Sequence, residues 1–410
     1  EPGQRLRCPV VVTARTSASG FATAAAGGDN LWAHNDLAVE APRVFVRDLS
    51  GYYANLTPID ARDVTVSGNR FIVLGYFESD GQGGPEMGAS HSWSNMGIDA
   101  VRLTGVTQAV MFGAGGNAAM RSTYLTVIPT IEEETSSRFD VVNAWDNNAT
   151  ISIPLFHYTF HSGELGGLLS YMADREPATF ATAISFFGMK PGKLWANIHH
   201  EQAKRTAPMQ HIREAGGTWA NVPGNQTDEN YFKNWHWFYR MVMANRLNDN
   251  WKLRAYEYAR IRIQDLLGVA MTHRPNGHPA IPPVAAGGAA ATLGQVFTSE
   301  AAIAILLRWH VNRSAHIAGG GVAPHAADRL WDVMRRAQVP AQNGGHNLVW
   351  NTDVAAWGNN HEAALIEAII SQVATFDANL SARLVAIRDT APVVGHNLSR
   401  DRGSLQFHAP

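Results

Sequence analysis

From about residue 163 onward, apolar side chains recur at spacings of three and four, which is the period of an α-helix. Glu176-Pro177 places an acid and a proline in a first turn, and Thr298-Ser299-Glu300 is a capping sequence before a segment that is apolar nearly all round. The pattern predicts helices over 177–187, 227–247, 250–267, 300–309 and 324–338.

The longest predicted helix is Asn360–Arg388. Its apolar stripe would cover one face for about 40 Å at 1.5 Å per residue. We expect that face to pack along another long helix or a neighbouring subunit. The stripe consists of Leu365, Ile369, Val373, Phe376, Leu380, Leu384 and Ile387.

Residues 1–160 have a different pattern, with short runs of Val, Ile, Thr and aromatic residues separated by Gly, Asn, Asp and Pro. Ser67-Gly68-Asn69 between two such runs predicts a hairpin turn. The fold class expected is therefore α+β, with a strand-rich N-terminal region before a predominantly helical region of long packed helices. The candidate strands are Pro9–Ala14, Arg43–Asp48, Asp63–Ser67, Arg70–Tyr76, Ala100–Leu103, Thr107–Phe112, Thr123–Pro129 and Thr150–His161.

These patterns divide the chain into regions. Residues 1–160 form the strand-rich region, with a Ser/Ala/Gly-rich stretch at 16–30 expected to be a flexible arm. Residues 161–275 and 295–410 are the helical regions, and 276–294 is an Ala/Gly/Pro-rich loop between them.

Composition narrows the class of protein. The 410 residues include one cysteine, Cys8, which excludes an internal disulfide framework. The formal net charge of −2 predicts no strong binding to nucleic acid or anionic membrane, and we expect no membrane contact. There are 28 arginines against five lysines, and Arg is the cation suited to interfaces. The chain begins with Glu1 and not Met, which indicates proteolytic processing of a larger subunit.

Two motifs suggest chemistry but lack the context for it. Gly113–Ala118 fits the dinucleotide fingerprint, yet the strand expected at 123–127 leaves no room for the helix that such a site needs, so we predict a glycine-rich loop. His199-His200-Glu201 has Lys204 where a second zinc ligand would stand. We therefore predict no metal and no cofactor. The run Glu132–Glu134 is expected to be a solvated loop.

Histidines and aromatic residues give the alternative reading. His157 and His161 are four residues apart and lie on one face of the predicted strand, and the segment 234–240 is the densest aromatic patch. Core packing accounts for these positions most simply, but they are also compatible with a sugar-binding cleft in a polysaccharide-active enzyme built from a helical toroid and a β-sandwich. Its candidate catalytic residues are His157, His199, His236, Tyr239 and Arg240.

In composition and in the pattern of predicted elements, the chain resembles capsid proteins of double-stranded RNA viruses of fungi, of the totivirus and quadrivirus kind. The features that carry this resemblance are the helix-rich body with a strand-rich portion, Arg in place of Lys, many His and Trp, the Ala/Gly/Pro-rich loop at 279–294, the arm at 16–30 and the processed terminus.

The resemblance implies a structural subunit, or a processed fragment of one, in an icosahedral capsid around double-stranded RNA, and it favours a structural role over an enzymatic one. It implies self-association with copies of the chain, a second capsid chain or fragment of the same precursor as partner, weak non-specific contact with RNA, and a place in a virion assembled in the host cytoplasm. A binding module released by proteolysis is a third reading.

Overall fold

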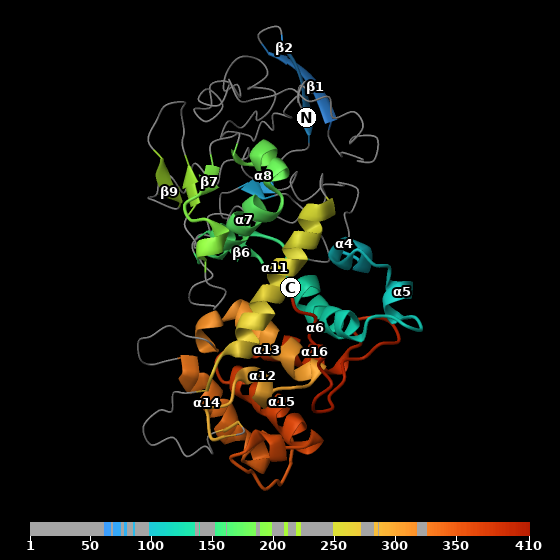
Figure 1. Ribbon diagram of the computed structural model, residues 1–410, viewed down its shortest axis with the longest axis vertical. Helices are drawn as coiled ribbons and strands as arrows, with labels where there is room; N and C mark the ends of the chain where they lie inside the picture. Colours follow the sequence, from blue (N-terminus) through green and yellow to red (C-terminus); the bar gives the residue numbers. More distant parts are fainter. Residues whose placement is uncertain are drawn as a thin grey trace. The chain divides into compact units, whose positions relative to one another are not determined.

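The structure is a computed structural model, and it describes a mainly helical chain with short strands (Figure 1). For the strands before residue 98, only the backbone is described. The described residues are 61–66, 69–74, 78–79, 85–86, 98–135, 139, 152–160, 162–185, 189–198, 209–211, 219–222, 249–271, 283–285, 287–317 and 326–410.

The described residues divide into two compact units. Unit 1 takes residues up to 98, 135–198 and 209–255. Unit 2 combines residues 99–134 with residues from 256 to 410. Each unit has its own buried apolar interior, and unit 2 carries the site described below.

The strands of unit 1 pair in small antiparallel sheets. β1 (Ala61–Val66) and β2 (Asn69–Leu74) pair with Ala61 opposite Leu74, which confirms the predicted hairpin. β3 (Glu78–Ser79) pairs with β4 (Pro85–Glu86). A three-stranded sheet, β7 (Met189–Pro191), β8 (Met209–His211) and β9 (Ala220–Val222), lies within the region predicted to be helical.

One predicted strand of unit 1 is wrong in form. The segment Thr150–His161 was expected to be a single half-buried strand, but β5 (Ser152–Ile153) pairs back on β6 (Tyr158–Thr159) as a tight hairpin. Ile153, Phe156 and Tyr158 are all buried in this hairpin. The alternation of residues in the sequence therefore does not separate a buried face from a solvent-facing one.

The helices of unit 1 begin where the sequence predicts. α7 (Glu164–Arg175) follows Gly163, and α8 (Pro177–Ala183) has its proline in the first turn, where no intrahelical amide is needed. α8 ends at Ala183, earlier than the predicted Phe187. A short 3₁₀ turn, η4 (Trp195–Asn197), brings the indole of Trp195 4.9 Å from the ring of Tyr171.

Three predicted strands between residues 98 and 135 are helices instead. They correspond to α4 (Ala100–Thr104), α5 (Gln108–Phe112) and α6 (Ala118–Thr135). Asp99, Thr107 and Asn117 each accept a hydrogen bond from the backbone N–H three residues ahead, so caps start these helices. The β-branched residues that suggested strands are buried in α6, because burial outweighs a propensity of a few tenths of a kcal/mol.

Most helices of unit 2 match the prediction. α11 (Asp249–Gly268), α13 (Glu300–Asn312) and α14 (Ala326–Ala337) cover the expected segments. α13 is buried on every side from Glu300 to His310, as its apolar composition predicts. The loop predicted at 276–294 ends in α12 (Leu293–Val296), where Leu293 is fully buried. The remaining 3₁₀ turns are η6 (Ser314–His316), η7 (Pro340–Gln342) and η8 (Val354–Ala356).

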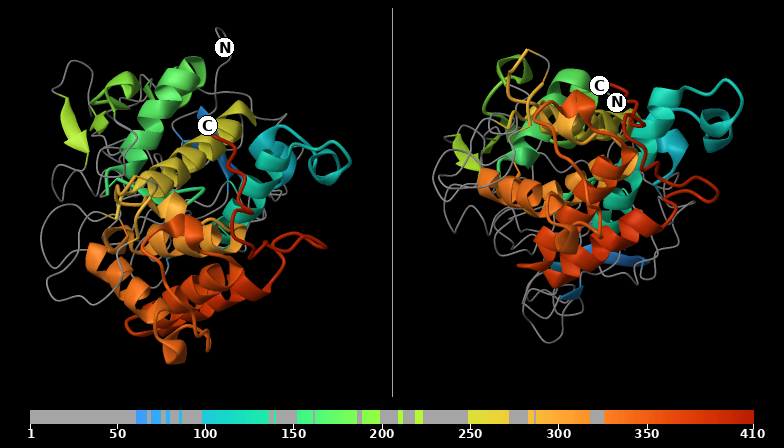
Figure 2. Two further views of the ribbon diagram at one scale, coloured as in Figure 1. Left: turned by 60° about the horizontal axis from the view of Figure 1, so that its bottom comes forward. Right: turned by 90° about the horizontal axis from the view of Figure 1, so that it is seen from below.

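The single long helix predicted over Asn360–Arg388 is wrong. The chain breaks between α15 (Asn359–Ala374) and α16 (Ala378–Asp389), and α15 packs against α14, α16 and α13 (Figures 1 and 2). Asp377 accepts a hydrogen bond from the N–H of Leu380 and so starts a new helix. Apart from the half-buried Phe376, the stripe from Leu365 to Ile387 is buried within unit 2, not on a free face.

Several predicted segments lie outside the described residues. These are the strands at 9–14 and 43–48, the arm at 16–30 and the aromatic helix at 227–247.

Candidate functional site

Of the candidate catalytic residues of the enzyme reading, only His157 lies within the described residues. His157 is half-buried in the turn between β5 and β6 and has a φ of 47°. His199, His236, Tyr239 and Arg240 lie outside the described residues. No group of three or more His, Cys, Asp or Glu in the described part of the chain is arranged to hold a metal ion.

The glycine-rich motif is a turn between two helices. Gly113–Ala118 connects α5 to α6, whereas a dinucleotide fingerprint follows a strand. Gly115 has a φ of 81°, and a Cβ on Gly116 would lie 2.2 Å from the carbonyl oxygen of Met111. The glycines are therefore required by a sharp helix-to-helix turn.

The acidic run predicted to be a solvated loop forms the last turn of α6. The carboxylate of Glu134 pairs with the fully buried guanidinium of Arg308 on α13. Glu133 lies 3.3 Å from Arg383 on α16 and 3.7 Å from Arg308. Glu132 and Glu133 are exposed, as expected. The loop prediction was wrong, because the arginines that pair with Glu133 and Glu134 are about 170 residues or more further along the chain.

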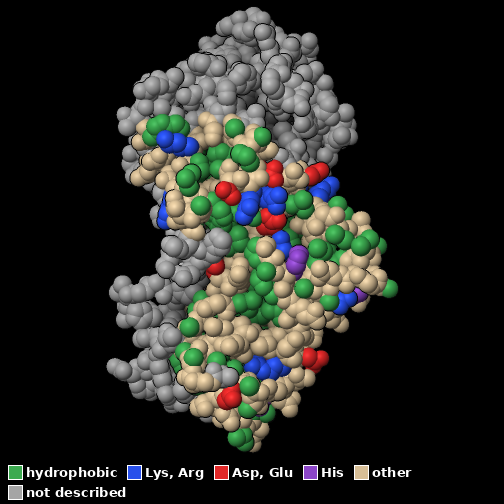
Figure 3. All heavy atoms as spheres, viewed as in Figure 1, with side chains coloured by type: hydrophobic (Ala, Val, Ile, Leu, Met, Phe, Trp, Pro, Cys, Tyr) green, Lys and Arg blue, Asp and Glu red, His purple; other side chains and the backbone are tan. Residues whose placement is uncertain are grey.

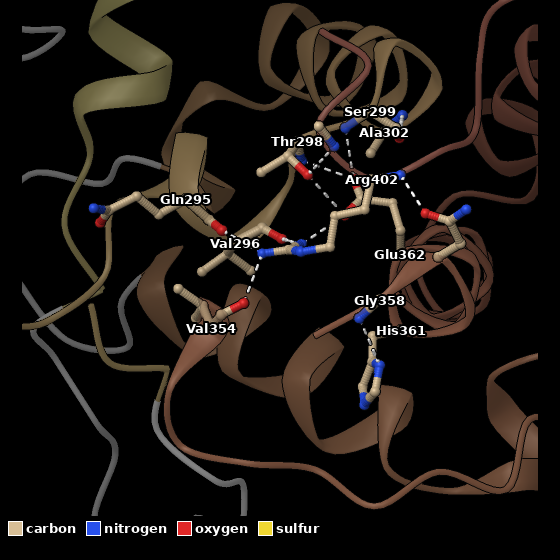
Figure 4. Close-up of polar contacts among 12 residues, drawn as sticks. Gln295, Val296, Thr298, Ser299, Ala302, Val354, Gly358, His361, Glu362 and Arg402 are labelled. Atoms are coloured by element: carbon tan, nitrogen blue, oxygen red, sulfur yellow. Dashed lines mark hydrogen bonds and ion pairs between the residues drawn. The ribbon is translucent and has the colours of Figure 1, made fainter. Parts of the chain in front are cut away.

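The carboxylate of Glu362 in unit 2 accepts four hydrogen bonds (Figure 4). Glu362 lies in the first turn of α15, and its side chain is fully buried. Its Oε1 accepts hydrogen bonds of 2.7 Å from the backbone N–H groups of Thr298 and Ser299. Those amides precede α13, so the carboxylate lies at the positive end of that helix.

Arg402 is the counter-ion of the Glu362 carboxylate. One guanidinium nitrogen donates to Oε2 of Glu362 at 2.8 Å and to the carbonyl of Val296 at 2.8 Å. The other donates to the carbonyls of Gln295 at 2.7 Å and Val354 at 3.1 Å (Figure 4). The guanidinium also lies 5.6 Å from the ring centre of Trp357. Four acceptors on three segments are thus tied by one planar side chain.

Residues 391–410 form an extended segment, here named the C-terminal strap, which is held along its length. The N–H of Ser399 donates to Glu300, and the carbonyl of Ser399 accepts from the N–H of Ala301. Further along, the N–H groups of Gln406 and His408 donate to the hydroxyls of Ser122 and Thr123 on α6. The strap therefore joins α6 to α13, and Figure 2 shows it in red beside α6.

The chemistry open to the site follows from these bonds. Both oxygens of Glu362 are occupied by donors and the group is closed to solvent, so it is a structural clamp and offers no free proton acceptor. Sequence reasoning missed it, because a lone Glu and a lone Arg 40 residues apart carry no local signal. The capping sequence Thr298-Ser299-Glu300 was the one local clue to its position.

In the described part of the chain, no helix is both long enough and apolar enough to span a membrane. No known protein family, curated protein or solved structure matches this chain.

Proposed function

We propose that this chain is a structural subunit of an icosahedral capsid that encloses double-stranded RNA, in a virion assembled in the host cytoplasm. The observation that carries the proposal is an exposed aliphatic surface on the cross-braced helical frame of unit 2. A shell subunit needs this combination, because it must present fixed apolar contacts to its neighbours.

Three exposed valines, here together named the valine patch, are Val101 on α4, Val110 on α5 and Val394 in the strap. Val110 is 61% exposed and Val394 is 97% exposed. The rings of Phe112 and His396 lie 4.1 Å apart and join α5 to the strap. Figure 3 shows apolar side chains gathered over α4 and α5. The segment from 106 to 120 contains no charged residue, so it suits contact with another apolar protein surface.

The frame beneath the patch is braced by arginines. Arg402 ties the strap to α15, Arg308 ties α6 to α13, and Arg388 on α16 lies 2.5 Å from Glu367 on α15. Hydrogen bonds with Asp389 and Glu367 raise the pKa of Arg388, so this cation remains charged at all physiological pH values. Fixed geometry lowers the entropy cost of joining subunits.

The partners proposed are copies of this chain and a second capsid chain. The net charge of −2 fits weak, non-specific contact with packaged RNA, because tight binding requires many cations to neutralise phosphates. The clamp at Glu362 and the patch at Val110 and Val394 are contact and support features, which is why the structural function is preferred to the enzyme reading.

The test is the mass of the native assembly. The full chain is purified together with any capsid chain that binds it. The sample is then analysed by size-exclusion chromatography with light scattering and by electron microscopy. We expect particles of megadalton mass, and we expect Val110→Asp and Val394→Asp to shift the protein to small species. Val349→Asp is the matched control, because Val349 is 92% exposed but is not part of the valine patch.

Two results would contradict the proposal. One is a chain that remains monomeric at every concentration with its capsid partner present. The other is particle formation that is equally sensitive, or equally insensitive, to Val110→Asp and Val349→Asp.

A further inference from the structure

Four histidines in unit 2 share one hydrogen-bonding arrangement, in which Nδ1 of the ring is the acceptor. In each of them the ring nitrogen Nδ1 faces a group that can only donate a hydrogen bond. The contacts are Arg262 Nε to His310 at 3.1 Å, Trp309 Nε1 to His316 at 3.4 Å, the backbone N of Gly358 to His361 at 3.1 Å, and Arg260 Nη1 to His408 at 2.9 Å.

This polarity fixes the state of each ring. A guanidinium, an indole N–H and a backbone N–H have no lone pair to offer, so Nδ1 must carry the lone pair and the imidazole must be neutral. The proton then lies on Nε2, and Nε2 of His361 is accordingly 3.1 Å from the carbonyl oxygen of Val349. A second proton on any of these rings would place a donor against a donor.

We propose that unit 2 is an acid-sensitive element, stabilised by His316 and His408 in their neutral forms, so that mild acidification makes it open more often. The inference does not depend on the capsid proposal. It concerns the stability of the unit whether or not the chain assembles.

The surroundings of His408 oppose a positive charge. Arg260 of α11 faces its ring and also donates to the carbonyl of Ala409 at 2.9 Å. The acidic neighbour is Glu257, whose carboxylate lies 3.9 Å from the other end of Arg260, and Tyr256 lies under that guanidinium. Burial and then Arg260 lower the pKa of His408.

His316 is also surrounded by cations. Arg329 of α14 lies 4.9 Å from the ring centre of Phe376, and the ring of Phe376 lies 4.8 Å from His316. Arg313, just before η6, is the second cation, and its acidic partner is Asp377 at 3.5 Å. Burial, followed by Arg329 and Arg313, lowers the pKa of His316.

His310 and His361 lie at helix ends. His310 is fully buried, and Arg262 of α11 donates both to its ring and to its carbonyl. The last turn of α13 favours a cation weakly, whereas the guanidinium of Arg262 contacts the ring directly. His361 is in the first turn of α15, and its Nδ1 accepts a hydrogen bond from the N–H of Gly358. Its ring stacks with Trp357 and meets the edge of Trp350, and the nearby acid, Glu362, is already paired with Arg402.

The direction of the effect follows from proton linkage. Where the folded pKa of a histidine is below the unfolded value of about 6.5, the unfolded chain binds more protons at mildly acidic pH. Stability is therefore complete above the unfolded pKa and falls as the pH drops below it. Between pH 7.5 and 5.5, each such histidine raises the opening equilibrium constant by up to about tenfold. Carboxylates titrate mainly below this window.

Amide hydrogen exchange of the full chain is the test, read on peptides from α13 and α15 and corrected for the intrinsic pH dependence of exchange. From pH 7.5 to 5.5 we expect the opening constant to rise, by at most about a hundredfold from His316 and His408 together. His316→Asn and His408→Asn keep an acceptor near Nδ1 but cannot be protonated, so each should remove up to about a factor of ten from that rise. His346→Asn is the matched control, because residue 346 is hydrogen-bonded through its backbone.

A second measurement covers the case in which a variant fails to fold. In the chain labelled with ¹⁵N-histidine, the rings of His310, His316, His361 and His408 should show an unprotonated Nδ1 at pH 7.5. The proposal is overturned if the opening constant rises less than about threefold, if the two Asn variants change the rise no more than His346→Asn does, or if these rings carry a proton on Nδ1.

Discussion

Removing the side chain of Arg402 would leave the carboxylate of Glu362 charged, fully buried and without its counter-ion. Breaking a buried pair by deleting one partner costs about 3–5 kcal/mol. Three carbonyl oxygens, on Gln295, Val296 and Val354, would lose a donor as well. The two amide hydrogen bonds that Glu362 retains place the expected loss for Arg402→Ala toward the lower end of this range, at about 3 kcal/mol.

Arg400→Ala is the matched control in the same strap. Arg400 is 51% exposed and pairs with Asp389 at 3.1 Å, so its removal should cost less than about 1 kcal/mol. The assay is amide hydrogen exchange of α13 and α15 at neutral pH, because a chain with two units gives no guarantee of one unfolding transition.

The effect of Glu362→Gln on stability should have opposite signs in the normal chain and in the Arg402→Ala chain. Glu362→Gln should destabilise the normal chain, because it removes the charge that faces Arg402. The same substitution should stabilise the Arg402→Ala chain, because it removes an unpaired buried charge. The reasoning is refuted if Arg402→Ala and Arg400→Ala cost the same within about 0.5 kcal/mol, or if Glu362→Gln lowers stability equally in both backgrounds.

Three further predictions concern single elements of unit 2, each read from hydrogen exchange of that element. Gly116→Ala should cost about 1–3 kcal/mol in α5 and α6, because its Cβ would meet the carbonyl of Met111. Leu384→Ala should cost about 2–5 kcal/mol in α16, and a loss below 0.5 kcal/mol would mean that the stripe is not buried. Asp377→Ala should cost about 1 kcal/mol by removing the cap of α16. The N–H of Leu380 and then Arg313 lower the pKa of Asp377, so the difference from the normal chain should persist above about pH 4 and vanish at lower pH.

The sequence predicted those elements whose signal is local. Ser299 before Glu300, Pro177 after Glu176 and the turn at 67–69 each specify a cap or a turn through neighbouring atoms, and the structure has an element boundary at each place. The three strands predicted between residues 100 and 129 are helices, because Asp99, Thr107 and Asn117 each cap a helix start. The prediction of one long helix was wrong at Asp377, because Asp377 caps a new helix although the apolar pattern continues across it.

The candidate site shows where local reasoning stops. Nothing in the sequence around Glu362, Arg402 or Arg308 indicates a buried ion pair, and the partner of each lies 40 or more residues away. The four neutral histidines are of the same kind, because the donor that faces His310 or His408 comes from α11, 48 and 148 residues distant in sequence.

By itself, therefore, the sequence determined a mainly helical chain, the start of about half of the described helices, and a positive charge carried by arginine and not lysine. Only the tertiary structure decided that residues 99–134 join residues 256–410 in one unit, and that the apolar stripe is buried inside that unit. The physical reason is the separation along the chain between interacting residues. Caps and turns depend on residues a few positions apart, whereas ion pairs, core contacts and hydrogen-bond polarity depend on which distant segments meet.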